Sequence, residues 1–448
     1  MSVNNLSGHF DTKKIFRVTI GPVLMVVFSS VYSIVDGVFL SHFGGEGAFS
    51  GVNLVFPFLM VFGSLGFLFG TGGTAFVDKA LGEKDEKKAG ETFSLIVYST
   101  LVFGLLASLL CYFLIPPAIH GLSGLSKTSS EAMEKNAVLY GHVLASGIAL
   151  FILQNAFQSF FSAAGKQWTG FLFTVLAGVT NIVFDAVFIV GLRMGVLGAA
   201  IATLMGQFVG GALPLLYFRF RKGLPFRLGR THFQPTLVLK AMGNGSSEFV
   251  SNAAASLVST CYNIQLLSYV GEDGISAYAT VMYVSYIFMA VFFGYSLGLA
   301  PAVAYQYGAT NSSERKNLLR RSLVNLAVIG LVMFVLSESL SLPLARLFAG
   351  SNDNLRDLAL SAIRIYSFVF LSCGFSIFAS AFFTALSNGF VSALISLARS
   401  LVFELLFVFV LPLFWGVNGI WAAATFAEIG SSLLTLACYL VERRKYHY

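Results

Sequence analysis

Charged side chains are scarce in this chain of 448 residues, since Asp, Glu, Lys and Arg together make up 11% of it. Soluble globular domains carry about a quarter, so the composition excludes an ordinary water-soluble fold. Apolar residues make up 56%, with 46 phenylalanines, and a lipid bilayer accepts such side chains all round a helix. The apolar runs are about 20 residues long and lack two-residue alternation, which favours membrane-spanning helices over a β-barrel.

Cysteines and recognisable catalytic motifs are also scarce. The four cysteines lie far apart in apolar stretches with no CxxC spacing, and we interpret them as small buried hydrophobes. The sequence shows no nucleophile–base arrangement, metal cluster or nucleotide-binding motif, so we expect neither an enzyme nor a bound cofactor. The net charge of +7 lies in short clusters between apolar runs, which indicates membrane topology rather than a nucleic-acid partner.

Polar breaks divide the apolar sequence into about twelve predicted helices, in an all-α membrane fold. A basic segment over 219–236 separates two sets of six, and predicts a cytoplasmic linker between an N-lobe (1–218) and a C-lobe (237–448). The predicted helices cover 15–40, 51–78, 91–115, 137–161, 168–192 and 196–218 in the first set, and 237–269, 276–303, 321–343, 357–383, 391–414 and 419–440 in the second.

Lysine and arginine concentrate in every second loop between the predicted helices. If the N-terminus is cytoplasmic, only five of the 28 basic residues lie in outside loops, while Arg364 and Arg399 lie within helices. This bias follows the positive-inside rule and predicts that both termini are cytoplasmic. We expect a multi-pass protein of the bacterial cytoplasmic membrane. The five outside residues are Lys127, Lys135, Arg193, Arg346 and Arg356.

The two sets of predicted helices resemble each other weakly. Residues 43–47 and 270–274 each follow the first helix of their set, and residues 195–200 resemble residues 416–421. With six helices per set, matched segments face the same side of the membrane, so the lobes are expected to be related by a pseudo-two-fold axis along the membrane normal. Such duplicated halves are the usual plan of secondary transporters that work by alternating access.

Ionisable side chains within apolar helices are costly and therefore mark candidate functional sites. In the first half these are Asp36 and Asp185, and Asn181 lies one turn before Asp185 on the same helix face. Two carboxylates in a dry pocket repel each other, so the pair can hold and release a proton. The same oxygens suit Na⁺, and the choice between H⁺ and Na⁺ stays open. For Asp36, a solvated carboxylate near the helix end is the alternative.

The second half offers Glu248 early in its first helix, where a cavity-facing carboxylate and an ion at the membrane interface are equally consistent. Pro22 in the first helix is expected to bend it, which makes it a candidate gating hinge. We interpret four other ionisable residues as structural, and we attribute five glycines to close helix packing. The ionisable four are Glu338, Arg399, Glu404 and Glu428, and the glycines are Gly63, Gly66, Gly70, Gly72 and Gly73.

Four segments together resemble the MATE (multidrug and toxic compound extrusion) transporters, and look closest to their bacterial MepA-like branch. In this order on a duplicated chain they are fairly specific for the family. The segments are YSIVDGVF (32–39), NIVFD (181–185), GVLGAAIAT (195–203), and Pro301 before QYGATN (306–311).

The resemblance implies a V-shaped pair of six-helix lobes. It also implies antiport of amphipathic, often cationic drugs against H⁺ or Na⁺, and hence a role in drug resistance. Four matched positions are implied to bind the coupling cation, with Na⁺ as the candidate metal at the first three. These positions are Asp36, Asn181, Asp185 and Thr203.

We assign Tyr32, Phe39 and Glu248 to the substrate cavity. A Phe-lined cavity accepts lipophilic cations of varied shape, because apolar contact and cation–π attraction make little demand on geometry. Glu248 also matches a cation-binding position that one branch of the family pairs with an acid in the tenth helix. Residues 364–373 carry no carboxylate, which speaks against a second, C-lobe cation site and favours a role of Glu248 toward substrate.

The expected partners are small organic cations and membrane lipid, and we expect a monomer. A flippase for lipid-linked precursors is an alternative from the same superfamily, but the first half shows carboxylates where a phosphate would need basic residues. A membrane-embedded enzyme is a second alternative, which the lack of a His–Asp or metal cluster disfavours.

Overall fold

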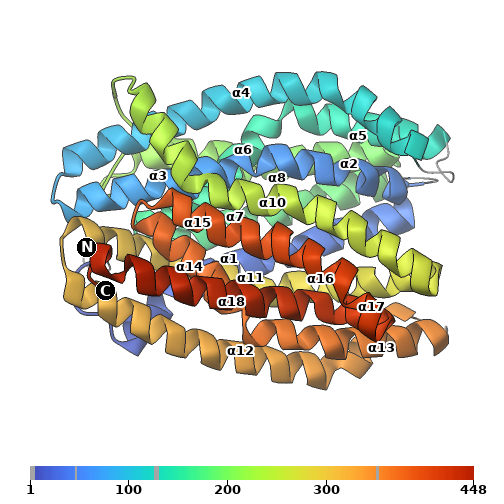
Figure 1. Ribbon diagram of the computed structural model, residues 1–448. Coiled ribbons are helices and arrows are strands. Elements are labelled where there is room, and N and C mark those ends of the chain that lie inside the picture. Colours follow the sequence, from blue (N-terminus) through green and yellow to red (C-terminus); the bar gives the residue numbers. More distant parts are fainter. Residues whose placement is uncertain (1–5, 46–47, 126–130, 350–352) are drawn as a thin grey trace.

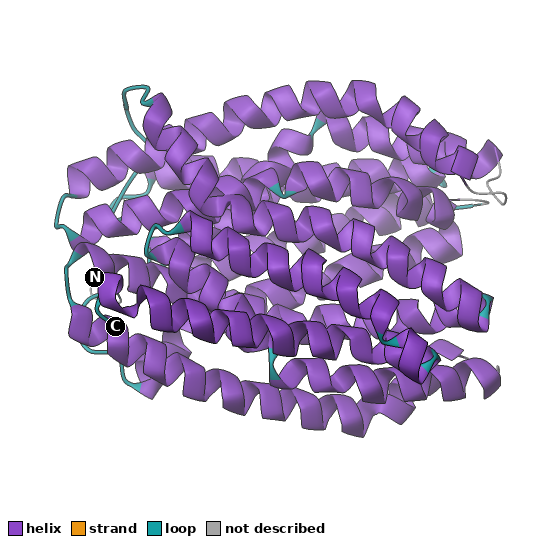
Figure 2. Cartoon of the chain, in the orientation of Figure 1, coloured by secondary structure: helices purple, strands orange, loops and turns teal. Residues whose placement is uncertain are grey.

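The computed structural model describes residues 6–45, 48–125, 131–349 and 353–448, and every regular element in these ranges is a helix (Figures 1 and 2). The helices run side by side along one common axis, and both chain termini lie at the same end of the bundle (Figure 1). We call this end the N–C end and the opposite one the far end. The predicted all-α fold is confirmed.

The first half of the chain runs from α1 to α9. Two of its helices continue as π-helical turns, with η2 (Ala186–Gly191) after α7 and η3 (Phe208–Ala212) after α8. The helices are α1 (Thr12–Phe43), α2 (Ala48–Gly63), α3 (Leu65–Gly82), α4 (Glu86–Leu125), α5 (Glu131–Ser146), α6 (Ile148–Ala163), α7 (Gln167–Asp185), α8 (Gly195–Gln207) and α9 (Leu213–Phe220).

The second half runs from α10 to α18. A 3₁₀ turn, η4 (Phe368–Leu371), follows α13, and a π-helical stretch, η5 (Ala398–Phe403), follows α15. The helices are α10 (Pro235–Val270), α11 (Glu272–Gly308), α12 (Ser312–Ala349), α13 (Asp353–Ser367), α14 (Cys373–Ala385), α15 (Gly389–Leu397), α16 (Glu404–Val410), α17 (Pro412–Trp415) and α18 (Val417–Tyr446).

Nine helical segments of the described chain are long and apolar enough to span a membrane, and eleven qualify if two bent pairs each count as one. α10 is a further helix of 36 residues, made less apolar by side chains such as Asn244, Glu248 and Asn252. With α10 the described part of the chain contains the twelve long segments that the sequence predicted.

The two bent pairs differ from the prediction of unbroken helices over 137–161 and 357–383. α5 and α6 meet at 62°, and α13 and α14 meet at 42°. At the first bend Gly147 leaves the helical conformation, and a Cβ there would lie 2.2 Å from Leu204 Cδ2. Hydropathy is the same for a straight and for a bent apolar helix, so neither bend could be predicted from it.

The apolar core is continuous across both halves near the N–C end and divided toward the far end. One cluster joins Phe93 and Phe218 of the first half with Phe292 and Phe378 of the second. Two further clusters each draw on one half alone and contain residues from the far-end turns of its helices. The halves are therefore held together at the N–C end and packed separately at the far end, consistent with a V-shaped pair of lobes.

Glycines bring the two halves into direct backbone contact near the N–C end. A Cβ added to Gly72 of α3 would lie 2.1 Å from the Ala241 carbonyl oxygen of α10. On the neighbouring face, a Cβ on Gly294 of α11 would lie 2.4 Å from Val23 Cα of α1. Such distances are sterically forbidden, so only glycine permits this approach. For Gly72 the attribution to close helix packing is confirmed.

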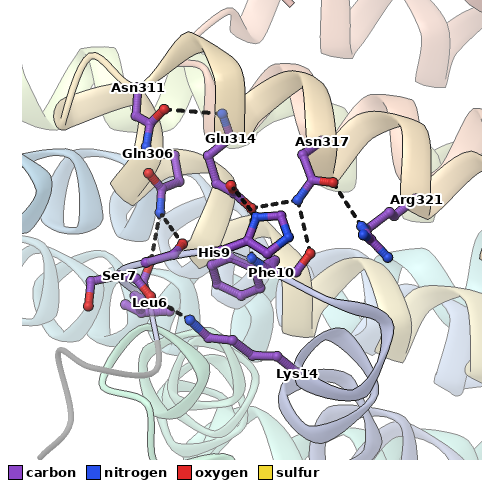
Figure 3. Close-up of polar contacts among 11 residues, drawn as sticks. Leu6, Ser7, His9, Phe10, Lys14, Gln306, Asn311, Glu314, Asn317 and Arg321 are labelled. Atoms are coloured by element: carbon purple, nitrogen blue, oxygen red, sulfur yellow. Dashed lines mark hydrogen bonds and ion pairs between the residues drawn. The ribbon is translucent and has the colours of Figure 1, made fainter.

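The segment before α1 fastens the N-terminus to the second half (Figure 3). The Glu314 carboxylate on α12 accepts hydrogen bonds from the Phe10 backbone N–H at 2.8 Å and from the Asn317 side chain at 2.7 Å, and it contacts His9 Nδ1 at 3.0 Å. Gln306 of α11 donates to the Leu6 carbonyl at 3.1 Å. Leu6 and Phe10 are fully buried, so the hydrogen bonds of the Phe10 N–H and of the Leu6 carbonyl are sheltered from water.

Glu314→Ala is expected to loosen this N-terminal attachment, because it leaves the buried Phe10 N–H without its acceptor at a cost of about 1–3 kcal/mol. Hydrogen–deuterium exchange should show faster exchange over residues 7–12. Glu91→Ala is the matched control, since the Glu91 side chain is 39% exposed and its partner Lys87 Nζ lies 4.0 Å away. Unchanged exchange in Glu314→Ala would contradict the attachment.

Candidate functional site

A cavity of about 100 Å³ lies inside the first half of the chain, between α1, α2, α5, α6, α7 and α8. It brings together residues that stand far apart in sequence. Asp185 lies one turn beyond Asn181 on α7, and its carboxylate faces that of Asp36. Four of the residues singled out from the sequence line the cavity itself, namely Tyr32, Asp36, Asn181 and Thr203.

This N-lobe pocket is acidic and short of hydrogen-bond partners. Both Asp185 oxygens, both polar side-chain atoms of Asn181 and one Asp36 oxygen are buried without a hydrogen bond to the described residues. None of the described lining residues is Lys or Arg. A buried charge without a partner costs several kcal/mol, so the two carboxylates require a proton or a cation.

The donor set of the pocket is rich in oxygen. The Thr203 hydroxyl donates to the Ala199 carbonyl of its own helix at 2.9 Å, which leaves its lone pairs as acceptors. Together with the carboxylates of Asp36 and Asp185 and the amide oxygen of Asn181, these are the ligands that hard cations prefer. The same carboxylates can share a proton, so the residues fit either H⁺ or Na⁺.

Local helix geometry places these side chains. α7 changes to π geometry directly after Asp185, and α8 does so directly after Gln207. π turns insert a residue into a helix and are frequent at functional sites. Gly206 lets α8 lie close against α7, because a Cβ there would lie 2.9 Å from the Ala177 carbonyl oxygen. The two helices therefore present Asn181 and Thr203 to one pocket, with Asp185 one turn beyond Asn181 and facing Asp36.

Three polar residues of the pocket were not singled out from the sequence, namely Tyr140, Gln154 and Gln207. Tyr140 is fully buried and lies beside Thr203, and Gln154 lies beside the Tyr32 hydroxyl. Their only sequence signal was an uncharged polar side chain inside an apolar run. Such side chains are common in membrane helices, so this signal does not separate site residues from packing residues.

A second cavity, of about 220 Å³, lies between the two halves of the chain, and we call it the inter-lobe cavity. α1, α3 and α6 line it from one side, and α10, α11 and α14 line it from the other. Its apolar wall includes two phenylalanines, Phe67 and Phe293. The ionisable residues of the described lining are both acidic, Asp78 and Glu248.

The three residues assigned to a substrate cavity do not share one cavity. Tyr32 lines the N-lobe pocket, and Glu248 lines the inter-lobe cavity. Phe39 packs against the apolar cluster of the first half and lines neither of these cavities. The grouping of Phe39 and Tyr32 rested on their common motif, but residues seven apart lie about two helical turns apart, which is roughly 10 Å along the axis.

Pro22 lies inside α1, which continues as a helix through it. The residue lies where α1 and α11 pack closely, since a Cβ on Gly294 would lie 2.9 Å from the Pro22 carbonyl oxygen. Its role as a hinge stays a prediction.

Ionisable residues of the second half pair with one another. Arg399 Nε donates to Glu428 Oε1 at 2.7 Å, and the Ser376 hydroxyl donates to Glu428 Oε2 at 2.7 Å. The Tyr262 hydroxyl donates to Glu404 at 2.7 Å. The interpretation of Arg399, Glu404 and Glu428 as structural is consistent with these contacts.

A family model described as MatE matches residues 22–187 and 249–410, which cover most of both halves. The chain belongs to the MatE family. The resemblance to MATE transporters is thereby confirmed, and with it the expectation of a transporter rather than an enzyme.

Curated relatives of this MatE protein support the MepA-like branch. This chain is 23% identical to the multidrug export protein MepA of Staphylococcus haemolyticus (strain JCSC1435). The matched 434 residues cover 96% of this chain and 94% of the relative. It is 20% identical over 442 residues to the protein of the same name from Staphylococcus aureus (strain MSSA476), covering 97% and 94%.

Solved structures share the two-lobe fold over the whole chain. An outward-facing multidrug resistance MATE family transporter of the MOP superfamily gives a TM-score of 0.90 at 21% identity, covering 100% of this chain and 98% of that one. A MATE protein solved in complex with MaL6 gives 0.91 at 20% identity, covering 100% and 99%. The multi-pass, all-helical membrane architecture of the MatE protein is therefore established.

Proposed function

We propose that this MatE protein exports amphipathic organic cations and is driven by H⁺ or Na⁺ moving in the opposite direction. The observation that carries the proposal is the facing pair of carboxylates, Asp36 in the lining of the N-lobe pocket and Asp185 beside it, since both Asp185 oxygens and one Asp36 oxygen are buried without a hydrogen bond to the described residues. The acidic inter-lobe cavity supports a cationic cargo. The names of the curated relatives, which are multidrug export proteins, point the same way.

The N–C end faces the cytoplasm of a bacterial cell, with the protein in the cytoplasmic membrane. Support comes from the basic residues, because the segments before α1, between α9 and α10 and after α18 are rich in Lys and Arg. In the conformation described, the halves touch at this end through Gly82 and Gly308, the last residues of α3 and α11, so the cytoplasmic side is the closed one.

Cation binding is coupled to the lobes through α1. A proton or Na⁺ at Asp36 and Asp185 removes the repulsion between α1 and α7, and its release restores that repulsion. α1 also packs on α11 of the other half where Val23 meets Gly294. A shift of α1 therefore changes the packing between an N-lobe (1–218) and a C-lobe (237–448), with Pro22 as the hinge. Because the cation binds one arrangement of the lobes more tightly than the other, its movement is coupled to the movement of the cargo.

A flippase for phosphate-bearing lipids fits the cavities less well. Both described cavities present carboxylates and neither is lined by Lys or Arg, so an anionic headgroup would be repelled. Organic cations remain the best-supported cargo, with membrane lipid around the helices, no nucleic acid and a monomeric protein.

Inverted membrane vesicles test the proposed export. Vesicles from cells that express the protein should accumulate ethidium when energised, because export in the cell becomes uptake in the inverted vesicle. The accumulated dye should be released when the H⁺ or the Na⁺ gradient is dissipated. Vesicles from cells with an empty vector are the control, and equal accumulation in both would contradict the proposal.

A further inference from the structure

Asp78 is a fully buried carboxylate that the proposed coupling does not use. It lies on α3, one turn before that helix ends at Gly82, and its side chain is 0% exposed. Neither of its oxygens makes a hydrogen bond or ion pair with the described residues. The adjacent Lys79 is not its partner, because Lys79 Nζ lies over the Tyr307 ring, 5.2 Å from the centroid.

Close backbone packing fixes Asp78 in this position. A Cβ on Gly82 would lie 2.1 Å from the Tyr305 carbonyl oxygen, and a Cβ on Gly308 would lie 2.0 Å from the Lys79 carbonyl oxygen. α3 is thus held against α11 at Lys79 and Gly82, directly after Asp78, and the carboxylate has little freedom to turn toward water. Charged, it costs several kcal/mol without a partner.

Asp78 lines the inter-lobe cavity at its N–C end. It reaches the cavity from the first half, while Glu248 reaches it from the second. Ala304 and Ala385, which close the same end, come from the last turns of α11 and α14. Each half therefore contributes one carboxylate to a single space, and the apolar wall that includes Phe67 lies beside them.

The cavity that Asp78 lines also contains hydroxyl groups that can accept hydrogen bonds. The hydroxyls of Thr71 and Thr74 donate to carbonyls of their own helix, at 2.7 Å and 3.0 Å, which leaves lone pairs facing outward. Ser159, also in the lining, has a buried hydroxyl oxygen without a hydrogen-bond partner among the described residues. Two acids with hydroxyl acceptors in the same cavity, and no Lys or Arg in its described lining, suit a positively charged donor better than an anion.

We propose that Asp78 binds the positively charged nitrogen of the cargo at the N–C end of the inter-lobe cavity, which Glu248 lines from the other half. The ligand class is an organic cation, such as a protonated amine or quaternary ammonium, whose apolar part lies against Phe67 and Phe293. This rests on the proposed function and adds to it a cargo-binding carboxylate distinct from Asp36 and Asp185. Asp78 contributes affinity for cargo, whereas the N-lobe pair binds the coupling ion.

Binding to the purified full-length protein tests this proposal. Fluorescence anisotropy of ethidium should show that Asp78→Asn weakens binding about tenfold or more, the equivalent of one lost charge contact. Asp78→Glu should retain most of the affinity. An uncharged dye of similar size should bind Asp78→Asn and the unchanged protein equally, because it makes no charge contact. Asp357→Asn, at an exposed position, is the control and should bind as the unchanged protein does.

The outcomes separate this proposal from the proposed function. Ethidium binding that is undiminished in Asp78→Asn would overturn the Asp78 site while leaving export intact. An equal loss of the uncharged dye would also overturn it, as would Asp78→Glu binding no better than Asp78→Asn. If the unchanged protein binds no cationic dye and moves none in vesicles, the proposed function itself fails. Size-exclusion chromatography of each variant identifies misfolded protein, for which Asp78→Glu provides the folded comparison.

Discussion

Asp185→Asn and Asp36→Asn are each expected to abolish cation-driven ethidium uptake in inverted vesicles, with a loss of at least about tenfold. The two carboxylates face each other, with Asp36 in the lining of the N-lobe pocket, and no Lys or Arg of that described lining neutralises them. Asparagine keeps the size of each side chain but cannot exchange a proton at neutral pH or supply a charged oxygen to Na⁺. The measurement is the initial rate of uptake under an imposed gradient.

Expression and dye binding separate lost coupling from lost folding. Both variants should be present in the membrane at the level of the unchanged protein, and both should still bind ethidium, because the inter-lobe cavity is untouched. Asp357→Asn provides a matched control outside both cavities and should transport at the normal rate. Undiminished uptake in both Asp36→Asn and Asp185→Asn would show that these residues do not carry the coupling.

Glu428→Gln is expected to destabilise the second half by about 3–5 kcal/mol, because it leaves a buried guanidinium without its counter-ion. Only 12% of the Arg399 side chain and 3% of the Glu428 side chain are exposed. Glu428 also accepts the Ser376 hydroxyl, so the variant disturbs two contacts. The melting temperature of the purified protein in detergent should fall clearly below that of the unchanged protein.

A double variant tests the cause of this loss. Arg399→Met combined with Glu428→Leu removes both charges and should restore much of the melting temperature, since buried ion pairs replaced by apolar residues are often neutral in stability. The exposed pair of Arg356 and Asp357 is the matched control, and Asp357→Asn should change stability little. A melting temperature of Glu428→Gln equal to that of the unchanged protein would contradict the assignment.

The helices could be predicted from the sequence because a long apolar run is stable as a helix in lipid, whichever helices it packs against. Even α10, whose Asn244 and Glu248 lower its hydropathy, was predicted at nearly its observed bounds, 237–269 against Pro235–Val270. The bends at Gly147 and Ser372 were not predicted. They depend on what each break packs against, as Gly147 does on Leu204, and apolar composition carries no record of that contact.

The candidate site could be predicted where a charge stood alone in an apolar run. Asp185 was found in this way, and the structure places it opposite Asp36. Asp78 was missed because it precedes Lys79 and a charged loop, which is the pattern of an ordinary membrane-interface residue. Its burial arises from the packing of α3 against Gly308 of α11, a tertiary contact between segments more than two hundred residues apart in the chain.

Transport in proteoliposomes with one gradient imposed at a time tests the central claim most directly. With a pH gradient alone and a Na⁺ gradient alone, at least one should drive ethidium in the direction opposite to the cation. The same gradient should drive no ethidium through Asp185→Asn. Movement of the dye that is independent of both gradients, or gradient-driven movement that persists in Asp185→Asn, would contradict a cation-coupled exporter whose coupling site lies in the N-lobe.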